Sequence, residues 1–485
     1  MKDSYLKCTG CESVHFPDLK NPVYSCENKG KAPANHILEK FLPKDFAFNI
    51  ANLLDSTQNR NPYVLFKRFF FSYYLAEKLS VNFDSIVNSI NSELRKFGEP
   101  GFNLTPFIVK DDIPNAPGRT LIKNETVNVS GSHKARHLMG NIIYLEVLRK
   151  AGILNEKQRL AIYSCGNAAL GAAAVAKAAG YALSVFIPPN VNPNVIKKLN
   201  FYEAKIVECP RISGETGDPC YNRFQEALAS GAVPFSCSGP DNWSNIEGGQ
   251  TLGLELFAQA ALAKQKINSI VIQVGGGALA SSAVKAIEEL NSSNVPICFP
   301  SIYTVQTNGG FPFFRAYLLV IKEIAEINHL KCSLDISDIV DLKSKTKSYL
   351  DYFSNHLGEI LAISAFAKQN YSSDKIQNIL KECAGNIRKF MWAWESEPHS
   401  IAHGILDDVT YDWFKIIQGM LRSGGIAVTV SEQELINANN IAKSISGINV
   451  DPTGSSGFAG YIKLKKLNII SKDSATAVIF TGVER

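Results

Sequence analysis

The stretch Val271-Ile-Gln-Val274-Gly275-Gly276-Gly277-Ala278-Leu279-Ala280 decides the fold class, because a short apolar run passes through three glycines into a helix-forming segment. Glycines let a backbone wrap an anion with its N–H groups pointing inward, and the start of a helix adds to the attraction. No Lys-Ser/Thr pair follows, and Gly-x-Gly-x-x-Gly is not satisfied, so a nucleotide loop is not indicated. The stretch predicts a site for a monophosphate, with tight helix–sheet packing as the alternative use of the glycines.

The same alternation of short β-branched runs and helical segments extends from about residue 105 to 310. This order is typical of a parallel sheet with crossover helices. Residues 60–94 have helical apolar spacing with an aromatic face, and residues from about 336 to 395 are predicted to be mostly helical. The expected strands are Leu160–Tyr163, Ala182–Ile187, Ala204–Glu208, Ile270–Val274, Ser301–Gln306 and Ala475–Phe480, and the clearest helices are Ala168–Ala179 and Glu247–Ala263.

Length and composition describe a globular protein of more than one average domain. The chain has 485 residues, 45% of them hydrophobic and 20% charged. Its net charge of +5 is scattered, which gives nucleic-acid binding no support, and its apolar runs are too short for a membrane span. The N-terminus lacks a secretory signal and the ten cysteines are mostly isolated, so we expect a cytoplasmic protein with reduced thiols.

Residues 1–30 resemble a degenerate zinc ribbon. Cys8-Thr-Gly-Cys11 is followed by Cys26, and the fourth thiolate is absent. Three cysteines do not close a tetrahedral structural site, although His15 or His36 could supply a fourth ligand. We expect an eroded ribbon or plain turns here and assign no metal ligand.

A reactive lysine is the second candidate feature. Asn128-Val-Ser-Gly-Ser132-His133-Lys134-Ala-Arg136 leads into a helix over Leu138–Ala151. A lysine that forms an imine must be accessible as the neutral amine, and the positive end of a helix disfavours the ammonium form. On spacing alone, an ordinary surface lysine in a turn is the favoured interpretation of Lys134.

Two further turns open helices. Ser164-Cys165-Gly166-Asn167 lies between a strand and an alanine-rich helix, where backbone N–H groups suit a carboxylate and Asn167 could donate to a phenolate-like oxygen. Asp451-Pro452-Thr453-Gly454-Ser455-Ser456-Gly457 is a hydroxyl-rich turn. Each is also explained as a simple helix N-cap.

Taken in order, the four motifs resemble those of the fold type II pyridoxal-phosphate enzymes, the tryptophan synthase β-like family that includes threonine synthase, threonine and serine dehydratases and cysteine synthase. The resemblance implies a two-lobed α/β fold with parallel-rich twisted sheets flanked by helices. Residues 31–140 and 265–485 would form a large cofactor-binding domain with a helical insertion at about 336–395, and residues 141–264 a smaller mobile substrate-binding domain. Because members of this family are commonly homodimers, the resemblance also implies a homodimer.

The resemblance also assigns roles. It makes Lys134 the catalytic residue that holds pyridoxal 5'-phosphate as an imine, and it lets Thr453, with Ser455 in reserve, face the pyridine nitrogen. A neutral hydroxyl there favours elimination over racemisation or transamination. The cofactor phosphate would be bound by Gly275, Gly276, Gly277, Ala278 and Leu279, the cofactor oxygen by Asn167, and the amino-acid substrate by Ser164, Cys165, Gly166 and Asn167.

The expected function is a pyridoxal-phosphate-dependent lyase that catalyses β/γ elimination or replacement in the manner of threonine synthase. Asn242–Thr251, Val305–Pro312 and the Cys-x-x-Cys start look like threonine synthase, whereas Gly275–Leu279 is closer to a dehydratase. A serine/threonine dehydratase and a catalytically silent pyridoxal-phosphate-binding relative are the alternatives.

Two further departures from the family pattern and one polar cluster stay open. His133 replaces an aromatic residue and is either an acid or base or a polar residue packed beside the ring. Cys165 is either a packing choice or a redox-sensitive thiol. His399 and His403 lie in a polar cluster, Ser396 to Gly404, that is either near the distal end of the substrate or an ordinary loop.

Overall fold

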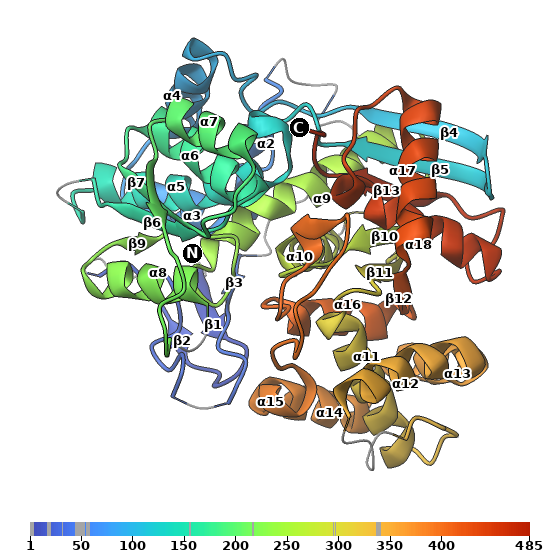
Figure 1. Cartoon of the computed structure of the whole chain (residues 1–485). Coiled ribbons are helices and arrows are strands. Elements are labelled where there is room, and N and C mark those ends of the chain that lie inside the picture. Colours follow the sequence, from blue (N-terminus) through green and yellow to red (C-terminus); the bar gives the residue numbers. More distant parts are fainter. Residues whose placement is uncertain are drawn as a thin grey trace.

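The computed structural model describes residues 4–16, 21–31, 33–43, 54, 59–154, 157–215, 218–293, 295, 297–335 and 341–485. Within these ranges the chain forms a six-stranded, a four-stranded and a three-stranded sheet surrounded by helices (Figure 1). The predicted α/β class with parallel-rich sheets is confirmed. Residues 336–340 of the predicted helical insertion lie outside the described ranges.

The six-stranded sheet carries most of the predicted site. Its order is β12-β11-β10-β13-β5-β4, and every pair is parallel except β4 with β5. Carboxyl ends of parallel strands meet at one edge, so the loops after β5, β10 and β13 are neighbours. The strands are β4 (Phe107–Ile113), β5 (Ala116–Asn124), β10 (Ser269–Gln273), β11 (Ser301–Thr307), β12 (Ala427–Val430) and β13 (Thr476–Phe480).

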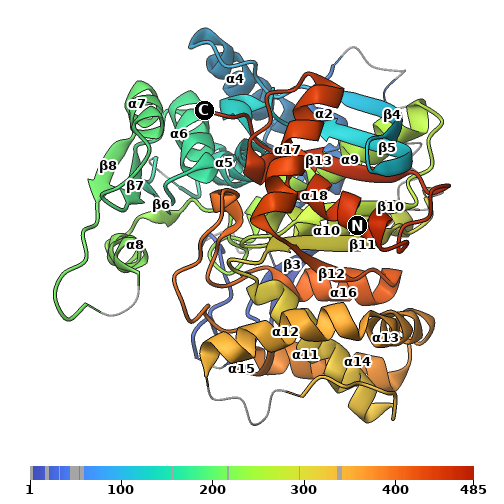
Figure 2. The ribbon, with the colours of Figure 1, turned by 45° about the vertical axis from the view of Figure 1, so that its right-hand side comes forward.

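Helices cover this sheet because its strands are buried along their length and need apolar partners. α18 packs against β10, β11, β12, β13 and β5, and α17 packs on α18; both lie in front of the sheet in Figure 2. The helices around the sheet are α5 (Lys134–Lys150), α9 (Ser244–Leu262), α10 (Ala278–Ser292), α16 (Trp413–Ser423), α17 (Glu432–Ser446) and α18 (Pro452–Lys466).

The four-stranded sheet has the order β8-β7-β6-β9 and is parallel throughout. Its alanine-rich helix α6 ends at Gly180, whose φ of 70° suits glycine. The predicted strands and helix here are confirmed, whereas the mobility of residues 141–264 stays a prediction. The elements are β6 (Leu160–Tyr163), α6 (Asn167–Ala179), β7 (Leu183–Ile187), α7 (Pro193–Phe201), β8 (Lys205–Glu208), α8 (Pro219–Ala229) and β9 (Val233–Pro234).

The N-terminal part begins with a small antiparallel sheet of β1 (Tyr5–Cys8), β2 (Val14–His15) and β3 (Leu38–Phe41). The helical stretch predicted over residues 60–94 is broken, because Ser80 adopts a φ of 56° and Asn82 caps a new helix by accepting from Ser85 N. The segment divides into α2 (Pro62–Leu65), the 3₁₀ turn η1 (Lys67–Phe69), α3 (Phe71–Lys78) and α4 (Phe83–Lys96).

The predicted helical insertion is confirmed where it is described, and it lies below the six-stranded sheet in Figure 1. It packs on α11 (Pro312–Ile327), whose sheet-facing residues are buried. None of the described helices is long and apolar enough to span a membrane. The insertion consists of α12 (Leu342–Asn355), α13 (Leu357–Gln369), α14 (Asp374–Gly385) and α15 (Ile387–Phe390).

Candidate functional site

The predicted reactive lysine stands at the carboxyl edge of the six-stranded sheet. Lys134 is the first residue of α5, after β5 and the short turn η2 (Val129–Gly131). His133 N donates to Thr481 O at 3.0 Å, and Ser132 forms a β-bridge with Gly482. These contacts fasten the start of α5 to the end of β13.

The amine of Lys134 is available for a bound molecule. The side chain is half-buried, and within the described ranges its Nζ has no hydrogen-bond or ion-pair partner. The neighbouring Ser132 Oγ is buried and also lacks a partner among the described residues. Buried polar groups are normally paired, so the unpaired Ser132 hydroxyl, two residues before an unpaired amine, calls for an explanation.

The four-stranded sheet contributes the loop between β6 and α6, whose helix packs beside Lys134. A Cβ on Gly171 of α6 would lie 2.9 Å from Ala135 N, so glycine permits α6 to pack directly on the start of α5. The loop Ser164–Asn167 precedes that contact, and nothing lies within 4 Å of a Cβ built on Gly166. Cys165 is exposed in this loop, and its two interpretations, a packing choice and a redox-sensitive thiol, both stay predictions.

Asn167 is held by the C-terminal arginine, which the sequence did not point to. Arg485 Nη1 donates to Asn167 Oδ1, and its Nη2 donates to Ser130 O at 2.6 Å. Since Ser130 belongs to η2, the arginine joins the α6 loop to the turn that precedes Lys134.

An acidic side chain lies against the glycine loop. Gly277 has a φ of 95° and caps the start of α10. The carboxyl oxygens of Asp407 lie against Gly275 and Gly276, and burial raises the pKa of Asp407. A Cβ on Gly275 would overlap that carboxylate, so the close approach depends on glycine. The loop thus leaves room for the carboxyl group of Asp407 beside its backbone.

Residues 405–412 cover the glycine loop and were missed in the sequence. Thr410 Oγ1 donates to Gly275 O at 2.8 Å, and Asp412 N donates to Gly276 O at 3.0 Å. The segment directly follows the polar cluster of residues 396–404. It contains no local sequence motif that would mark it as part of a site. It is the contact with Gly275 and Gly276 that makes it part of the site.

The two late hydroxyls differ in their hydrogen bonds. Its Oγ1 accepts from Gly404 N at 3.1 Å and keeps its proton for another acceptor. Ser455 Oγ accepts from Asn439 Nδ2 at 2.9 Å and is buried, so it serves the packing of α17 on α18. Gln273 at the end of β10 donates to Thr453 O at 3.4 Å, which joins Thr453 to the glycine-loop strand.

The predicted histidines differ in their surroundings. His133 is buried with Nδ1 3.3 Å from Thr481 O, and burial together with the charge of Lys134 holds the pKa of His133 well below its usual range. It is therefore neutral and packed. His403 is exposed, with Nδ1 3.3 Å from Ile401 O, and His399 presents its backbone to Gly309.

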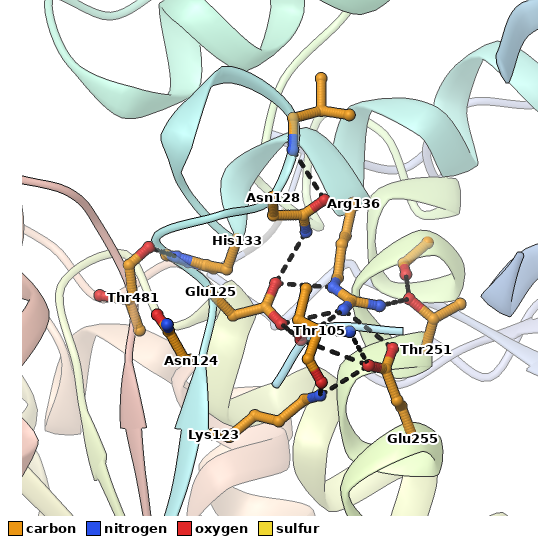
Figure 3. Close-up of polar contacts among 12 residues, drawn as sticks. Thr105, Lys123, Asn124, Glu125, Asn128, His133, Arg136, Thr251, Glu255 and Thr481 are labelled. Carbon is orange, nitrogen blue, oxygen red and sulfur yellow. Dashed lines mark hydrogen bonds and ion pairs between the residues drawn. The ribbon is translucent and has the colours of Figure 1, made fainter. Parts of the chain in front are cut away.

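A buried ion network supports the start of α5 (Figure 3). Arg136 Nε lies 2.7 Å from Glu125, Arg136 Nη2 lies 2.9 Å from Glu255, and Lys123 Nζ lies 2.6 Å from Glu255. All four side chains are at most 1% exposed. Burial opposes ionisation of Glu125, but the charge and hydrogen bonds of Arg136 outweigh it and lower the pKa of Glu125 to about 2. The network ties β5, α5 and α9 together beneath Lys134.

The carboxyl group of Asp412 makes stability depend on pH. Its Oδ1 has no partner among the described residues. Burial, with a smaller contribution from the charge of Asp241, raises the pKa of Asp412 to about 7 against the weaker effects of the Gly239 amide and Lys134. At pH values between the pKa of Asp412 in the unfolded chain and about 7, the folded protein holds a proton on Asp412 that the unfolded chain releases. The free energy of unfolding therefore falls as pH rises through this range.

We therefore expect Asp412→Asn to gain stability relative to the parent protein between pH 4 and pH 7, by at most about 1.4 kcal/mol per pH unit. Urea unfolding of both proteins at pH 5 and pH 8 measures the change. Asp351→Asn on the exposed face of α12 is the matched control for loss of a carboxylate. An equal stability difference at both pH values would refute the assignment.

Comparisons with known proteins agree with this geometry. The family described as pyridoxal-phosphate dependent enzyme matches residues 101–367, more than half of the chain. A serine dehydratase-like protein of Rattus norvegicus is 25% identical over 230 residues, which are 45% of this chain and 61% of that protein. A cysteine synthase of Flavobacterium sp. is 27% identical over 211 residues, 43% of this chain and 66% of that protein. The chain thus matches less than two thirds of the length of these relatives.

Solved structures share the fold. A T.th. threonine deaminase superposes with a TM-score of 0.53 and 19% identity, covering 82% of this chain and 98% of that one. Diaminopropionate ammonia lyase of Escherichia coli gives a TM-score of 0.54 and 14% identity, with coverage of 82% and 90%. The chain belongs to the pyridoxal-phosphate-dependent enzyme family, and its cofactor is pyridoxal phosphate.

Proposed function

We propose that this protein is a lyase that removes a substituent from the β carbon of an amino acid, with β-hydroxy amino acids as the foremost substrates. The observation that carries the proposal is the unpaired amine of Lys134 at the start of α5. That helix start packs on α6 at Gly171 and is joined to the end of β13 through His133, and the charge of Lys134 acts on Asp407 beside the glycine loop.

The residues present fit pyridoxal phosphate. The glycine loop precedes the N-terminus of α10, so its backbone N–H groups suit the phosphate, and binding there requires the Asp407 carboxyl group to move away from Gly275 and Gly276. Ser132, whose Oγ is unpaired, forms a β-bridge with Gly482 in the loop that follows β13, and Lys134 comes two residues later. The chemistry of this donor set is that of a phosphate cradle next to an amine able to form an imine.

The chain's own residues then have distinct tasks. When bound, the cofactor supplies an electron sink that makes the proton on the substrate Cα acidic. Lys134 Nζ removes that proton and later returns one. The amides of Ser164 to Gly166, at the start of α6, bind the substrate carboxylate, and Asn167 Nδ2 donates to the cofactor oxygen.

Thr453 directs the outcome toward elimination. Thr453 would face the pyridine nitrogen of the bound cofactor, and a neutral hydroxyl there would not keep that nitrogen protonated, which would favour loss of the β substituent. Relatives named serine dehydratase and cysteine synthase support the β carbon as the site of reaction.

A threonine-synthase-like γ elimination or replacement is the second candidate, favoured by the sequence of residues 242–251 and 305–312. Each segment also contains a residue whose side chain holds the fold together. Gln306 Oε1 accepts a hydrogen bond from Phe313 N at 2.8 Å, and Asn242 Nδ2 donates one to Pro234 O at 2.8 Å. We rank this candidate second because those contacts explain the residues without a γ substituent. The homodimer, the cytoplasmic location and the domain boundaries stay predictions.

Product analysis separates the candidates. We expect the protein with pyridoxal phosphate to release ammonia and a keto acid from L-serine or L-threonine, and to release no more than traces of phosphate from O-phosphohomoserine. Keto acid is measured by coupled reduction and phosphate by a colorimetric assay. Threonine formed from O-phosphohomoserine without keto acid would reject the dehydratase assignment in favour of the second candidate.

A further inference from the structure

Four metal-ligating side chains meet in the N-terminal part of the chain, whose small sheet of β1, β2 and β3 lies at the lower left in Figure 1. The ligand atoms of Cys8, Cys11, Cys26 and His36 all lie within 4.8 Å of one another. Cys8 ends β1, Cys11 lies in the turn that follows, and His36 comes two residues before β3. The fold therefore brings together three segments that the sequence keeps apart.

The separations match those of a tetrahedral zinc site. Cys8 Sγ and Cys26 Sγ lie 3.5 and 3.7 Å from His36 Nδ1, and Cys11 Sγ lies 3.6 Å from Cys26 Sγ. Zinc–sulfur and zinc–nitrogen bonds at tetrahedral angles place two sulfurs about 3.8 Å apart, and a sulfur and a nitrogen about 3.6 Å apart. A disulfide would require about 2.05 Å between Cys11 and Cys26.

We propose that Cys8, Cys11, Cys26 and His36 bind one Zn²⁺ ion. Three thiolates and one imidazole fill all four positions, so the site is structural and leaves no position for a catalytic water. Asn28 N donates to Cys26 Sγ at 3.4 Å, and Asn28 Nδ2 donates to Cys11 Sγ at 3.5 Å. Such hydrogen bonds stabilise the charge of thiolate ligands.

His36 takes the place of the missing fourth cysteine, while His15 does not. His15 Nε2 pairs with Ser13 Oγ at 3.2 Å, outside the group of four ligand atoms. Zinc would therefore join the turn after β1 to the residues before β3. The three cysteines of the ribbon-like sequence pattern do not reach β3 without His36.

The small sheet needs such a link. Its strands have four, two and four residues, and units of this size rarely bury enough apolar surface to hold their shape without a metal or disulfide. The same part of the chain braces the segment before α9, because Trp243 Nε1 donates to Val23 O at 2.7 Å and Lys29 pairs with Asp241 at 2.5 Å. Zinc at this site would stabilise that contact.

Metal analysis of the full-length protein tests the proposal. We expect about one zinc per chain after purification, and Co²⁺ substitution should give thiolate charge-transfer and tetrahedral ligand-field bands. His36→Ala should weaken Zn²⁺ binding, measured by chelator competition, by more than the roughly 10–100-fold that loss of a residue hydrogen-bonded to a ligand costs. His15→Ala and Cys298→Ser, an exposed cysteine elsewhere, are the matched controls and should bind zinc like the parent protein.

Two results would overturn the proposal. One is a parent protein that lacks zinc and gives no thiolate–cobalt bands after reduction and Co²⁺ addition. The other is equal zinc affinity in His36→Ala and the parent protein. The cobalt spectrum of the parent protein decides the question even if His36→Ala fails to fold.

Discussion

Replacement of Lys134 by alanine is expected to abolish the imine absorbance of the purified protein and to lower kcat by roughly 10²–10⁴-fold or more, because the same amine attaches the cofactor and transfers the Cα proton. The amine has no other partner within the described ranges, so its loss breaks no contact of the fold. Absorbance spectra with added pyridoxal phosphate and keto-acid release from L-serine measure the two effects.

Lys150→Ala is the matched control for Lys134→Ala, since Lys150 is exposed at the other end of α5. It should leave both the absorbance band and kcat unchanged. An absorbance band that survives Lys134→Ala would place the imine on another lysine. A normal band that no amino acid alters would favour the catalytically silent relative.

Replacement of Glu255 by glutamine is expected to lower the free energy of unfolding by about 3–5 kcal/mol, because it leaves Lys123 and Arg136 buried with a single carboxylate between them. Urea unfolding followed by circular dichroism measures the change. The α5 start carries Lys134, so we also expect the affinity for pyridoxal phosphate to fall in this variant.

Glu203→Gln is the matched control for the buried network. Glu203 pairs with Lys177 at 2.8 Å but is 76% exposed, and solvent-exposed pairs contribute about 0–1 kcal/mol. If the two substitutions cost the same, the network beneath Lys134 would not hold α5 in place by charge.

The fold could be predicted from the sequence where the signals are local. The strand at Leu160–Tyr163 is confirmed residue for residue, because a short apolar run ends at a turn there. The break near Ser80 and Asn82 was missed, since the apolar spacing of helices continues through it and only the left-handed backbone at Ser80 ends α3.

The site could be predicted only where a motif carries it. The motifs around Lys134, Asn167, Gly275 and Thr453 share local patterns of glycine, hydroxyl and amide at helix starts. Asp407 and Arg485 have no such pattern, because their places depend on how residues 405–412 and the C-terminus fold back over the sheet edge.

Borohydride reduction followed by peptide mass spectrometry tests the central claim most directly. Reduction converts an imine between a lysine and pyridoxal phosphate into a stable secondary amine, which marks the residue that held the cofactor. We predict one modified peptide, with the pyridoxyl phosphate group on Lys134. Modification of a different lysine, or a protein that binds pyridoxal phosphate without any modified lysine, would contradict the role of Lys134.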